Sequence, residues 1–590
     1  MSNGEHTDCY IGIDVGTGGA RACVIDHNGN IVGLASQNIK TWQPHPEYYE
    51  QSTTDIWGSI CTAVKQAVEQ SNVSQARVKG IAFDATCSLA VFSKETDRPV
   101  SVSGTEANND RNVILWLDHR SIDETKAINA TGHSVLQYVG GGMSVEMEMP
   151  KILWLKKHMN PSAFLDCKFY DLADALTHLA TGQETRSNCS VICKQGYLAT
   201  GSDSREEGWQ SDFLTSIGLG DLSKDDFEAL GGINGKNGQY LGAGEYVGPL
   251  TEKAAAELGL SPGIAVGSGV IDAYAGWIGT VGAKFDQGLA SLPDQRENVF
   301  HRLAVVAGTS TCHLAMSNKE FLVPGVWGPY RDVLFPGAYL AEGGQSATGE
   351  LIRHVVESHP AYSEANAAAK TAGIHVYDFL NDCLRKEAKK AQVAHIAQLA
   401  KHFFFYGDIW GNRSPIADPQ MSGAIIGLKS DQSINNLALH YYGVLEFIAL
   451  QTRQIIDTMN QHGYEISTIF MSGSQTQNDL LVHSIASACD MPVILPKYVH
   501  AAVCHGAAML AAVAAGKCSK EVSKGLWEIM GQMSKPGRRV DPTTDKAERC
   551  LLQAKYEVFL DICFKQREYR ELVDRRVNSV KGDIRACSSK

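Results

Sequence analysis

The sequence predicts an α/β protein in which one architecture occurs twice, once in each half of the chain. Three observations lead to this prediction. The run YIGIDVGTGGAR at residues 10–21 reads as a strand, a Gly/Thr turn and a second strand, and LAVVAGTSTCHLA at residues 303–315 repeats that order. Apolar strands alternate with longer segments of helical periodicity in both halves. The chain of 590 residues is long enough for about two to four domains.

The first predicted lobe spans residues 1–279. Its opening strands are YIGIDVG, RACVIDHNG and NIVGLASQNI, and the Asn28-Gly29 pair marks the turn between the last two. TTDIWGSICTAVKQAVEQ has the apolar spacing of a helix, and VKGIAFDAT is a further buried strand. After a polar, Gly-rich middle from about residue 120 to 250, GIAVGSGVIDAYAGWIG predicts a strand that runs into a helix.

A linker over residues 280–300 is expected to precede the second lobe at residues 301–520, and a helical extension and tail to follow at residues 521–590. In the second lobe, LALHYYGVLEFIALQTRQIIDTMNQHG predicts a long amphipathic helix that ends at a glycine. ISTIFMSGSQTQNDLLVHSIASAC predicts a strand, a Gly/Ser turn and a helix, and AAVCHGAAMLAAVAAG predicts a helix of small residues suited to close packing.

Composition and charge limit the classes of function. The chain is 44% hydrophobic, with a net charge of −12 and fifteen scattered cysteines. An acidic chain without a long basic run is a poor partner for nucleic acid or an anionic membrane. Cysteines without metal-ligand spacing suit reduced thiols, and the first residues lack the pattern of a leader. We therefore expect a cytoplasmic protein with no nucleic-acid or membrane partner.

The two Gly/Thr turns are candidate phosphate-binding loops. Backbone N–H groups in such a turn form a partly positive nest for phosphate oxygens, although the same residues also suit an ordinary hairpin. Asp14 ends the first strand, where a carboxylate suits a hydrated Mg²⁺. Asp272 lies between an apolar strand and a helix start, so it is either a general base or a helix N-cap. The sequence has no P-loop motif and no protein-kinase catalytic loop.

The order of these segments resembles the FGGY family of carbohydrate kinases, within the superfamily of sugar kinases, Hsp70 and actin. The segments are Asp14 with its Gly/Thr loop, Asp272-Ala-Tyr-Ala, Gly308 to Thr311 and Ser472 to Ser474, and the similarity spans roughly residues 9–575. The resemblance implies two actin-like (ribonuclease H-like) lobes with duplicated βββαβα cores and an ATP and sugar cleft between them. It also implies that Asp272 is the catalytic base and that Asp14 holds Mg²⁺ through water.

The same resemblance implies which residues contact ATP. The expected contacts are Gly16, Thr17, Gly18, Gly19 and Arg21 in the first loop, Gly308, Thr309, Ser310 and Thr311 in the second, and Gly473, Ser474 and Asn478 beside the adenosine. The sequence departs from the family pattern at Gln477, where a lysine is common, and at His500, where a glutamate is common. The cofactors implied are ATP and Mg²⁺.

The acceptor site resembles that of D-ribulose kinases. FDATCSLAVF at residues 83–92 is similar to their TCSLV signature, and AEGGQSATGEL at residues 341–351 contains their GQSATG segment. The expected sugar contacts are Thr86, Cys87, Lys194, Asp272 and Glu342. A lone lysine is more commonly a solvated surface residue, and the GQSATG turn also suits a helix N-cap formed by Ser346.

Four other charged residues have no assigned catalytic role. Asp118 and Arg120 in LWLDHR either contact the sugar or form a local ion pair. Lys151 and Arg413 are interpreted as structural.

We predict an ATP-dependent kinase that phosphorylates the terminal hydroxyl of a pentulose, converting D-ribulose to D-ribulose 5-phosphate. One alternative is the same reaction on L-ribulose, xylulose or a polyol, and a more distant one is an ATPase switch like actin or Hsp70. The expected partner is a small-molecule sugar, with a homodimer as a further option. A kinase kept only as a binding protein is disfavoured because Asp14 and Asp272 are both present.

Overall fold

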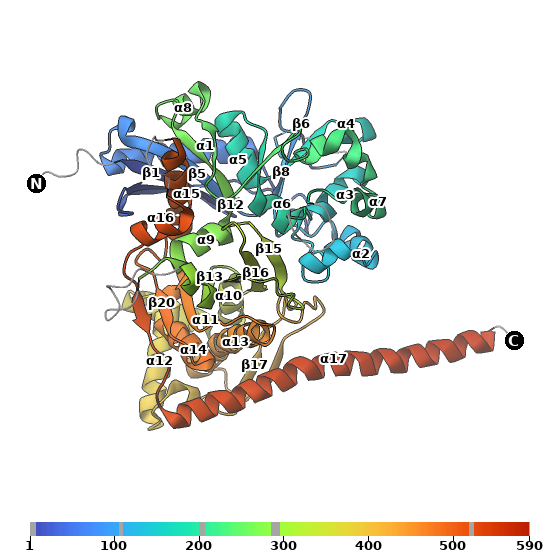
Figure 1. Ribbon diagram of the computed structural model, residues 1–590. Helices are drawn as coiled ribbons and strands as arrows, with labels where there is room; N and C mark the ends of the chain where they lie inside the picture. Colours follow the sequence, from blue (N-terminus) through green and yellow to red (C-terminus); the bar gives the residue numbers. More distant parts are fainter. Residues whose placement is uncertain (1–7, 105–109, 200–206, 285–295, 519–523, 589–590) are drawn as a thin grey trace, which may run out of the picture.

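The computed structural model describes residues 8–104, 110–199, 207–284, 296–518 and 524–588. Figure 1 shows two α/β lobes, one above the other, each built around a sheet. The predicted α/β class with two lobes is therefore confirmed. The linker predicted over residues 280–300 lies mostly outside the described residues.

The first lobe is built on a central sheet whose strands run in the order β11-β12-β5-β1-β2-β3. Its strands are β1 (Cys9–Gly16), β2 (Gly19–Asp26), β3 (Ile31–Asn38), β4 (Glu50–Gln51), β5 (Val78–Ala85), β6 (Leu89–Ser93), β7 (Val113–Ile114), β8 (Cys167–Asp171), β9 (Thr185–Ser187), β10 (Gln239–Leu241), β11 (Tyr246–Pro249) and β12 (Ala265–Ile271). Its α-helices are α1 (Thr53–Ser71), α2 (Ile122–Ala130), α3 (Glu148–His158), α4 (Pro161–Leu165), α5 (Leu172–Thr181), α6 (Asn188–Lys194), α7 (Ser211–Ser216), α8 (Glu252–Leu258) and α9 (Asp272–Val281). β1, β2 and β3 form an antiparallel meander, and β5 and β12 continue the sheet parallel to β1.

The second lobe repeats this plan in a sheet ordered β15-β16-β14-β13-β19-β20-β21. Its strands are β13 (Arg302–Ala307), β14 (Thr311–Ser317), β15 (Trp327–Arg331), β16 (Tyr339–Gln345), β17 (Phe404–Tyr406), β18 (Ala424–Ile426), β19 (Thr468–Ser472), β20 (Val493–Leu495) and β21 (Arg538–Val540). The α-helices of this half of the chain are α10 (Gly349–Ser358), α11 (Tyr362–Ala372), α12 (Val376–Lys390), α13 (Ile434–Gln461), α14 (Asp479–Cys489), α15 (Ala502–Cys518), α16 (Leu526–Met533) and α17 (Lys546–Ser588). β13 and β14 are antiparallel, and β19 is parallel to β13, as β5 is to β1.

Local sequence explains the elements that carry the site. The turn between β2 and β3 holds Gly29 at φ 80°, as the Asn-Gly pair predicts. Ser52 caps the N-terminus of α1, and Ile56 and Ile60 lie on its buried face. The predicted long helix is α13, and Gly463 follows it at φ 108°.

Helices cover both faces of the first sheet. α1, α5 and α8 pack on one face, and α9 and α15 pack on the other. α15 approaches closely because β1 and β5 present glycines to it: a Cβ at Gly12 would lie 2.0 Å from the Cys504 carbonyl oxygen, and one at Gly80 would lie 2.2 Å from that of Ala511. The predicted division at residues 301–520 assigns α15 to the second lobe, whereas its contacts join it to the first sheet (Figure 1). The boundaries themselves stay a prediction.

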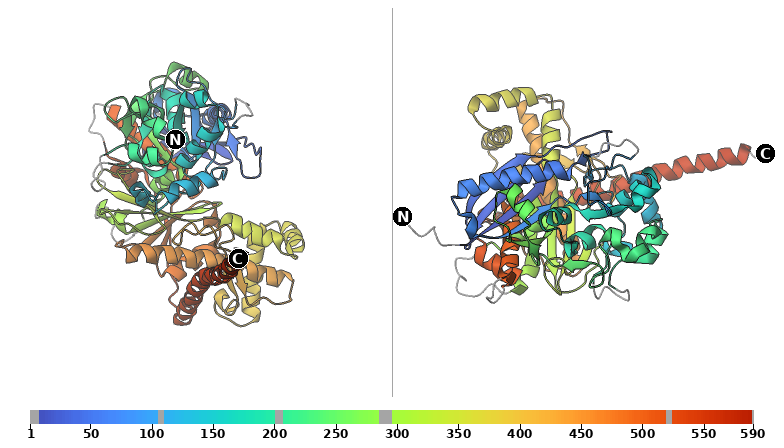
Figure 2. Two further views of the ribbon diagram at one scale, coloured as in Figure 1. Left: turned by 90° about the vertical axis from the view of Figure 1, so that its right-hand side faces the viewer. Right: turned by 90° about the horizontal axis from the view of Figure 1, so that it is seen from above.

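The C-terminal extension predicted over residues 521–590 contains two helices and one strand in the described residues. α16 packs against α15, and β21 pairs with β20 at the edge of the second sheet. α17 crosses the second lobe, where Lys555 forms a buried ion pair of 2.5 Å with Glu446 of α13, and its C-terminal part projects beyond the lobe (Figures 1 and 2). None of the described helices combines the length and apolar character needed to cross a membrane.

Candidate active site

Three aspartates gather where adjacent parallel strands end. Asp14 lies near the end of β1, Asp84 near the end of β5, and Asp272 begins α9 directly after β12. The strands are neighbours in the order β12-β5-β1, and Asp14 and Asp84 are register partners. Asp84 is therefore the central acid, fully buried between the other two.

The environment of Asp272 suits a proton acceptor. Burial, followed by the charge of Asp14, raises the pKa of Asp272 to about 7. Its Oδ1 accepts a 2.7 Å hydrogen bond from the N–H of Ala273. The N-cap position of α9 is occupied by Ile271, so capping does not account for the carboxylate. The role of Asp272 as the base stays a prediction.

Sequence reasoning missed Asp84. Its two carboxylate oxygens receive no hydrogen bond from an N–H or O–H donor within the described part of the chain. Burial, Asp14 and Asp272 raise the pKa of Asp84 well above its usual range. The available signal was an acid at the end of a buried strand, the pattern that singled out Asp14, but FDATCS was interpreted only as a sugar segment.

The first predicted loop is the tight β1–β2 hairpin, in which Gly16 pairs with Gly19 across Thr17 and Gly18. The Thr17 hydroxyl accepts a 3.0 Å hydrogen bond from the Trp116 indole. Arg21 lies 3.3 Å from Asp14 and donates a 3.0 Å bond to the carbonyl of His500, so it connects the first loop to the chain before α15. Neighbouring groups thus hold the loop in place, while Gly18 remains exposed.

The second predicted loop, residues 308–311, joins β13 to β14. The Gly308 carbonyl accepts hydrogen bonds from the N–H of Gly349 at 3.2 Å and from Nε2 of Gln475 at 2.6 Å. The Gly308 N–H donates to the Ser310 carbonyl, and the Thr309 carbonyl accepts from the N–H of Thr348. The side chain of Thr311 meets that of Thr348 at 2.8 Å. The loop is therefore fixed to the start of α10 and to the SGSQTQ segment.

The third predicted ATP segment begins at Gly473, which has φ 96° and room for no side chain, because a Cβ would lie 2.1 Å from the Ala307 carbonyl oxygen. Ser474 follows in a short 3₁₀ turn. The Asn478 amide caps α14 and donates a 2.7 Å bond to the Tyr441 hydroxyl. The Gly473 N–H donates a 2.9 Å bond to the carbonyl of Val499, the neighbour of His500, so contacts link this segment to the second loop and to Arg21 of the first.

The two departures from the family pattern face each other. Nε2 of Gln477 lies 3.2 Å from Nε2 of His500. An amide and an imidazole can interact in this way without opposite charges.

Lys194 and Glu342 meet across the lobes at 3.1 Å. Lys194 ends α6 of the first lobe, and Glu342 lies on β16 of the second. Burial alone would lower the pKa of Lys194, but Glu342 outweighs it and raises the pKa well above its usual range. Tyr274 donates a 2.9 Å hydrogen bond to the same carboxylate, and Lys194 lies 4.4 Å from the centroid of the Trp327 ring. Lys194 is therefore a buried residue and not a solvated one.

Thr86 and Cys87 follow β5, directly after Asp84. The Thr86 N–H donates to the Val15 carbonyl at 2.9 Å, and its hydroxyl lies 3.1 Å from that of Ser88. Burial raises the pKa of Cys87 well above its usual value, so the thiol is neutral. Both residues therefore lie at the strand ends that carry the aspartates.

The structure shows which contacts Asp118, Arg120 and Ser346 make. Arg120 donates two hydrogen bonds of 2.9 and 3.0 Å from Nε to the carboxylate of Asp118 and one of 3.1 Å to Glu50. All three side chains are fully buried, and Asp118 and Arg120 form a local ion pair. The N-cap position of α10 is held by Thr348, whereas Ser346 donates to the carbonyl of Gly411.

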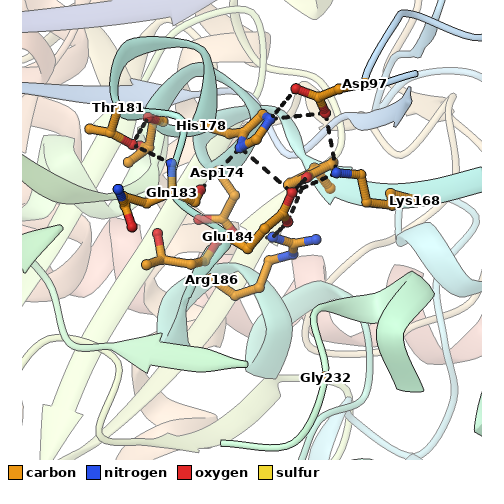
Figure 3. Close-up of polar contacts among 12 residues, drawn as sticks. Asp97, Lys168, Asp174, His178, Thr181, Gln183, Glu184, Arg186 and Gly232 are labelled. Carbon is orange, nitrogen blue, oxygen red and sulfur yellow. Dashed lines mark hydrogen bonds and ion pairs between the residues drawn. The ribbon is translucent and has the colours of Figure 1, made fainter. Parts of the chain in front are cut away.

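A second charged cluster lies outside this site, around α5 (Figure 3). Asp97, His178 and Glu184 present ligand atoms within 4.8 Å of one another. Lys168 lies 3.1 Å from Asp97 and 2.5 Å from Glu184, and Arg186 lies 3.6 Å from Glu184. Because these cations already lie against the carboxylates, the cluster is an ion-pair network and not a metal site.

Comparison with known proteins gives the family. The N-terminal domain of the FGGY family of carbohydrate kinases matches residues 9–279, and the C-terminal domain matches residues 303–515. A D-ribulokinase of Saccharomyces cerevisiae is 50% identical over 511 residues, covering 86% of this chain and 72% of that protein. An FGGY carbohydrate kinase domain-containing protein of Homo sapiens is 41% identical over 577 residues, covering 97% of this chain and 100% of that protein.

Solved structures agree on the fold. A xylulose kinase of Rhodospirillum rubrum has a TM-score of 0.72 at 19% identity and covers 95% of this chain and 99% of that one. A gluconate kinase of Lactobacillus acidophilus has a TM-score of 0.72 at 16% identity and covers 94% of this chain and 98% of that one. The chain belongs to the FGGY family of carbohydrate kinases, phosphotransferases that use ATP to phosphorylate an alcohol group of a sugar.

Proposed function

We propose that this enzyme transfers the γ-phosphoryl group of ATP to the terminal hydroxyl of D-ribulose. The observation that carries the proposal is the buried pair of Lys194 and Glu342, whose charges act directly on Asp272. A carboxylate and an ammonium group beside a candidate base offer both acceptors and donors to a polyhydroxylated sugar. The 50% identity to a D-ribulokinase supports this choice of acceptor.

Asp272 accepts the proton of the terminal hydroxyl as the oxygen attacks phosphorus. A pKa of about 7 leaves a substantial fraction of the carboxylate ionised at neutral pH, while keeping it basic enough to draw a proton in the transition state. Such a base contributes about 10²- to 10⁴-fold to the rate. The remainder of the catalysis comes from positioning and from neutralising charge on the phosphoryl group.

The loops at residues 16–19 and 308–311 supply backbone N–H groups to the phosphates of ATP. Asp14 and Asp84 fit a divalent cation, because their carboxylate oxygens are the hard ligands that Mg²⁺ prefers and Asp84 lacks a hydrogen-bond donor in the described residues. Bound Mg²⁺ would neutralise charge on the phosphate oxygens. The Arg21 guanidinium, 3.3 Å from Asp14, fixes the position of that carboxylate.

The adenosine lies beside Gly473 and Asn478. Asn478 is bonded to Tyr441, which stacks on Tyr377 with ring centroids 5.7 Å apart. Tyr377 lines a cavity of about 240 Å³ between α10, α11 and α12.

The test is an ADP-release assay with D-ribulose, L-ribulose, D-xylulose, glycerol and ribitol at matched concentrations. We expect the highest kcat/KM with D-ribulose and a product phosphorylated at the terminal carbon. A higher kcat/KM with D-xylulose or L-ribulose would reassign the acceptor within the same chemistry. ATP turnover that is independent of every sugar would overturn the proposal in favour of an ATPase switch.

A further inference from the structure

A second ion pair joins the lobes beside the proposed sugar site. Arg413, in the second lobe between β17 and β18, donates a 2.8 Å hydrogen bond from Nη2 to Oε1 of Glu146, which precedes α3 in the first lobe. Both side chains are largely buried, with relative exposures of 9% and 17%. A partly desolvated pair of this kind is held more firmly than one on the surface.

The chain makes room for this arginine. At Gly344, on β16 two residues after Glu342, a Cβ would lie 2.9 Å from Cδ and 3.1 Å from Nη1 of Arg413. Any larger residue at Gly344 would therefore displace the arginine stem. The glycine of the GQSATG segment thus places the Arg413 guanidinium next to the strand that carries Glu342.

Two tryptophans extend these contacts to both substrate regions. The Arg413 guanidinium lies 6.0 Å from the centroid of the Trp116 ring and 5.7 Å from that of Trp327. Trp116 donates to Thr17 in the first phosphate loop, and Trp327 covers Lys194. Any movement of Arg413 away from Glu146 would therefore disturb Trp116, which contacts the phosphate loop, and Trp327, which contacts the sugar site.

We propose that Arg413 and Glu146 form a clamp that holds the two lobes closed over the sugar, and that Arg413 is a positioning residue for phosphoryl transfer. The inference rests on the proposed function. The clamp is closed for most of the time, opens transiently to admit the sugar and closes again over it. Closure excludes water from the phosphoryl group and so suppresses ATP hydrolysis in the absence of a sugar.

The experiment compares wild type with Arg413→Met, Glu146→Gln and the double variant. Methionine keeps an apolar stem against the tryptophans while removing the charge, and glutamine changes Glu146 least. We expect each single variant to raise the KM for D-ribulose roughly tenfold and to raise the ratio of ATP hydrolysis to sugar phosphorylation. The double variant should not exceed the larger single effect by more than about twofold, because one interaction is lost in all three.

A second measurement does not depend on the sugar. With Mg²⁺ and AMP-PNP bound, small-angle X-ray scattering should give a larger radius of gyration for both single variants than for wild type. The matched control is Arg539→Met, which removes the exposed pair between Arg539 on β21 and Asp541 just after that strand, and which should change neither readout. Circular dichroism checks that each variant is folded.

Three results would each overturn the clamp. The first is an unchanged KM and hydrolysis ratio in both single variants, and the second is additive effects in the double variant. The third is a radius of gyration in the single variants equal to that of wild type. If wild type phosphorylates no sugar, the proposed function fails, while the scattering comparison still tests the clamp by itself.

Discussion

Lys194 and Glu342 are 148 residues apart in the sequence, come from different lobes and meet at 3.1 Å with almost no exposure to solvent. Each is the principal partner of the other's charge, since Tyr274 and Cys312 contribute only neutral groups to the carboxylate. Two charges buried in this way are stable only together.

Lys194→Met should therefore impair both stability and activity. Leaving Glu342 buried without its cation costs about 3–5 kcal/mol of unfolding free energy, and the KM for the sugar should rise at least about tenfold. Thermal unfolding and sugar titration measure the two effects. Adding Glu342→Gln should recover much of the stability but not the activity. Lys126→Met, which loses only an exposed pair with Asp123, is the control. Wild-type stability in Lys194→Met would contradict the burial of this pair.

Asp272→Asn should lower kcat by about 10²- to 10⁴-fold, because the amide cannot accept the hydroxyl proton. Binding of ATP and of sugar should change little, since the side chain keeps its size. Steady-state kinetics and calorimetric titration separate the two quantities. Asp123→Asn, on the exposed face of α2, serves as the control. A kcat within threefold of wild type would mean that another group accepts the proton.

The pH profile of kcat follows from the raised pKa of Asp272. A base acts only when it is deprotonated, so activity is complete above the pKa and is lost below it. With a pKa of about 7, kcat should fall about tenfold for each pH unit below that value and level off above it. A coupled assay between pH 5 and 9 measures the profile. A kcat that is constant from pH 5 to 7 would be incompatible with this carboxylate as the base.

Glu184 should make stability depend on acid. Burial alone would raise its pKa, but Arg186 and Lys168 outweigh burial and lower the pKa to about 2. Because the pKa in the folded state lies below the value of about 4.3 in an unfolded chain, the stabilisation is present above pH 4.3 and disappears between there and pH 2. Glu184→Gln should flatten the loss of thermal stability in that window, whereas Glu465→Gln, exposed beside His301, should not. Identical acid profiles for wild type and Glu184→Gln would exclude this contribution.

Gly12→Ala should weaken the contact between β1 and α15. Its Cβ would lie 2.0 Å from the Cys504 carbonyl oxygen, so the helix must move, at a cost of at least about 1–3 kcal/mol. Gly58→Ala in α1 is the matched control, because its Cβ meets nothing within 4 Å and should stabilise the helix by about 0.5–1 kcal/mol. Chemical denaturation measures both. Equal stability of the two variants would show that α15 adapts without strain.

The fold was predictable because its signals are local. The two strand–turn–strand runs, the Asn28-Gly29 turn and the apolar spacing of α1 and α13 each depend on residues close together in the sequence. The position of α15 was not predictable, because a run of small residues predicts close packing without identifying the surface that the helix packs against. Only the glycines at Gly12 and Gly80, hundreds of residues earlier, complete that information.

The candidate site likewise has a part that the sequence predicts and a part that it does not. Asp14 and Asp272 were found from their positions at strand ends, whereas Asp84 was overlooked although its position is equivalent. The meeting of Lys194 with Glu342, of Gln477 with His500 and of Arg413 with Glu146 could not be derived, because each pair depends on how distant segments come together. A single sequence identifies candidate side chains but contains no direct measure of which ones touch.

The position of α15 also has a consequence for biosynthesis. β1 begins at residue 9 and the helix that covers it begins at residue 502, so almost the whole chain must be translated before that face of the first sheet can be closed. At ribosomal rates of about 5–20 residues per second, the interval is roughly 25 to 100 seconds. During this time the nascent first lobe exposes an apolar sheet face, which makes it a client for chaperones. A transcript truncated before α15 would therefore yield an unfinished first lobe and not an independent N-terminal domain.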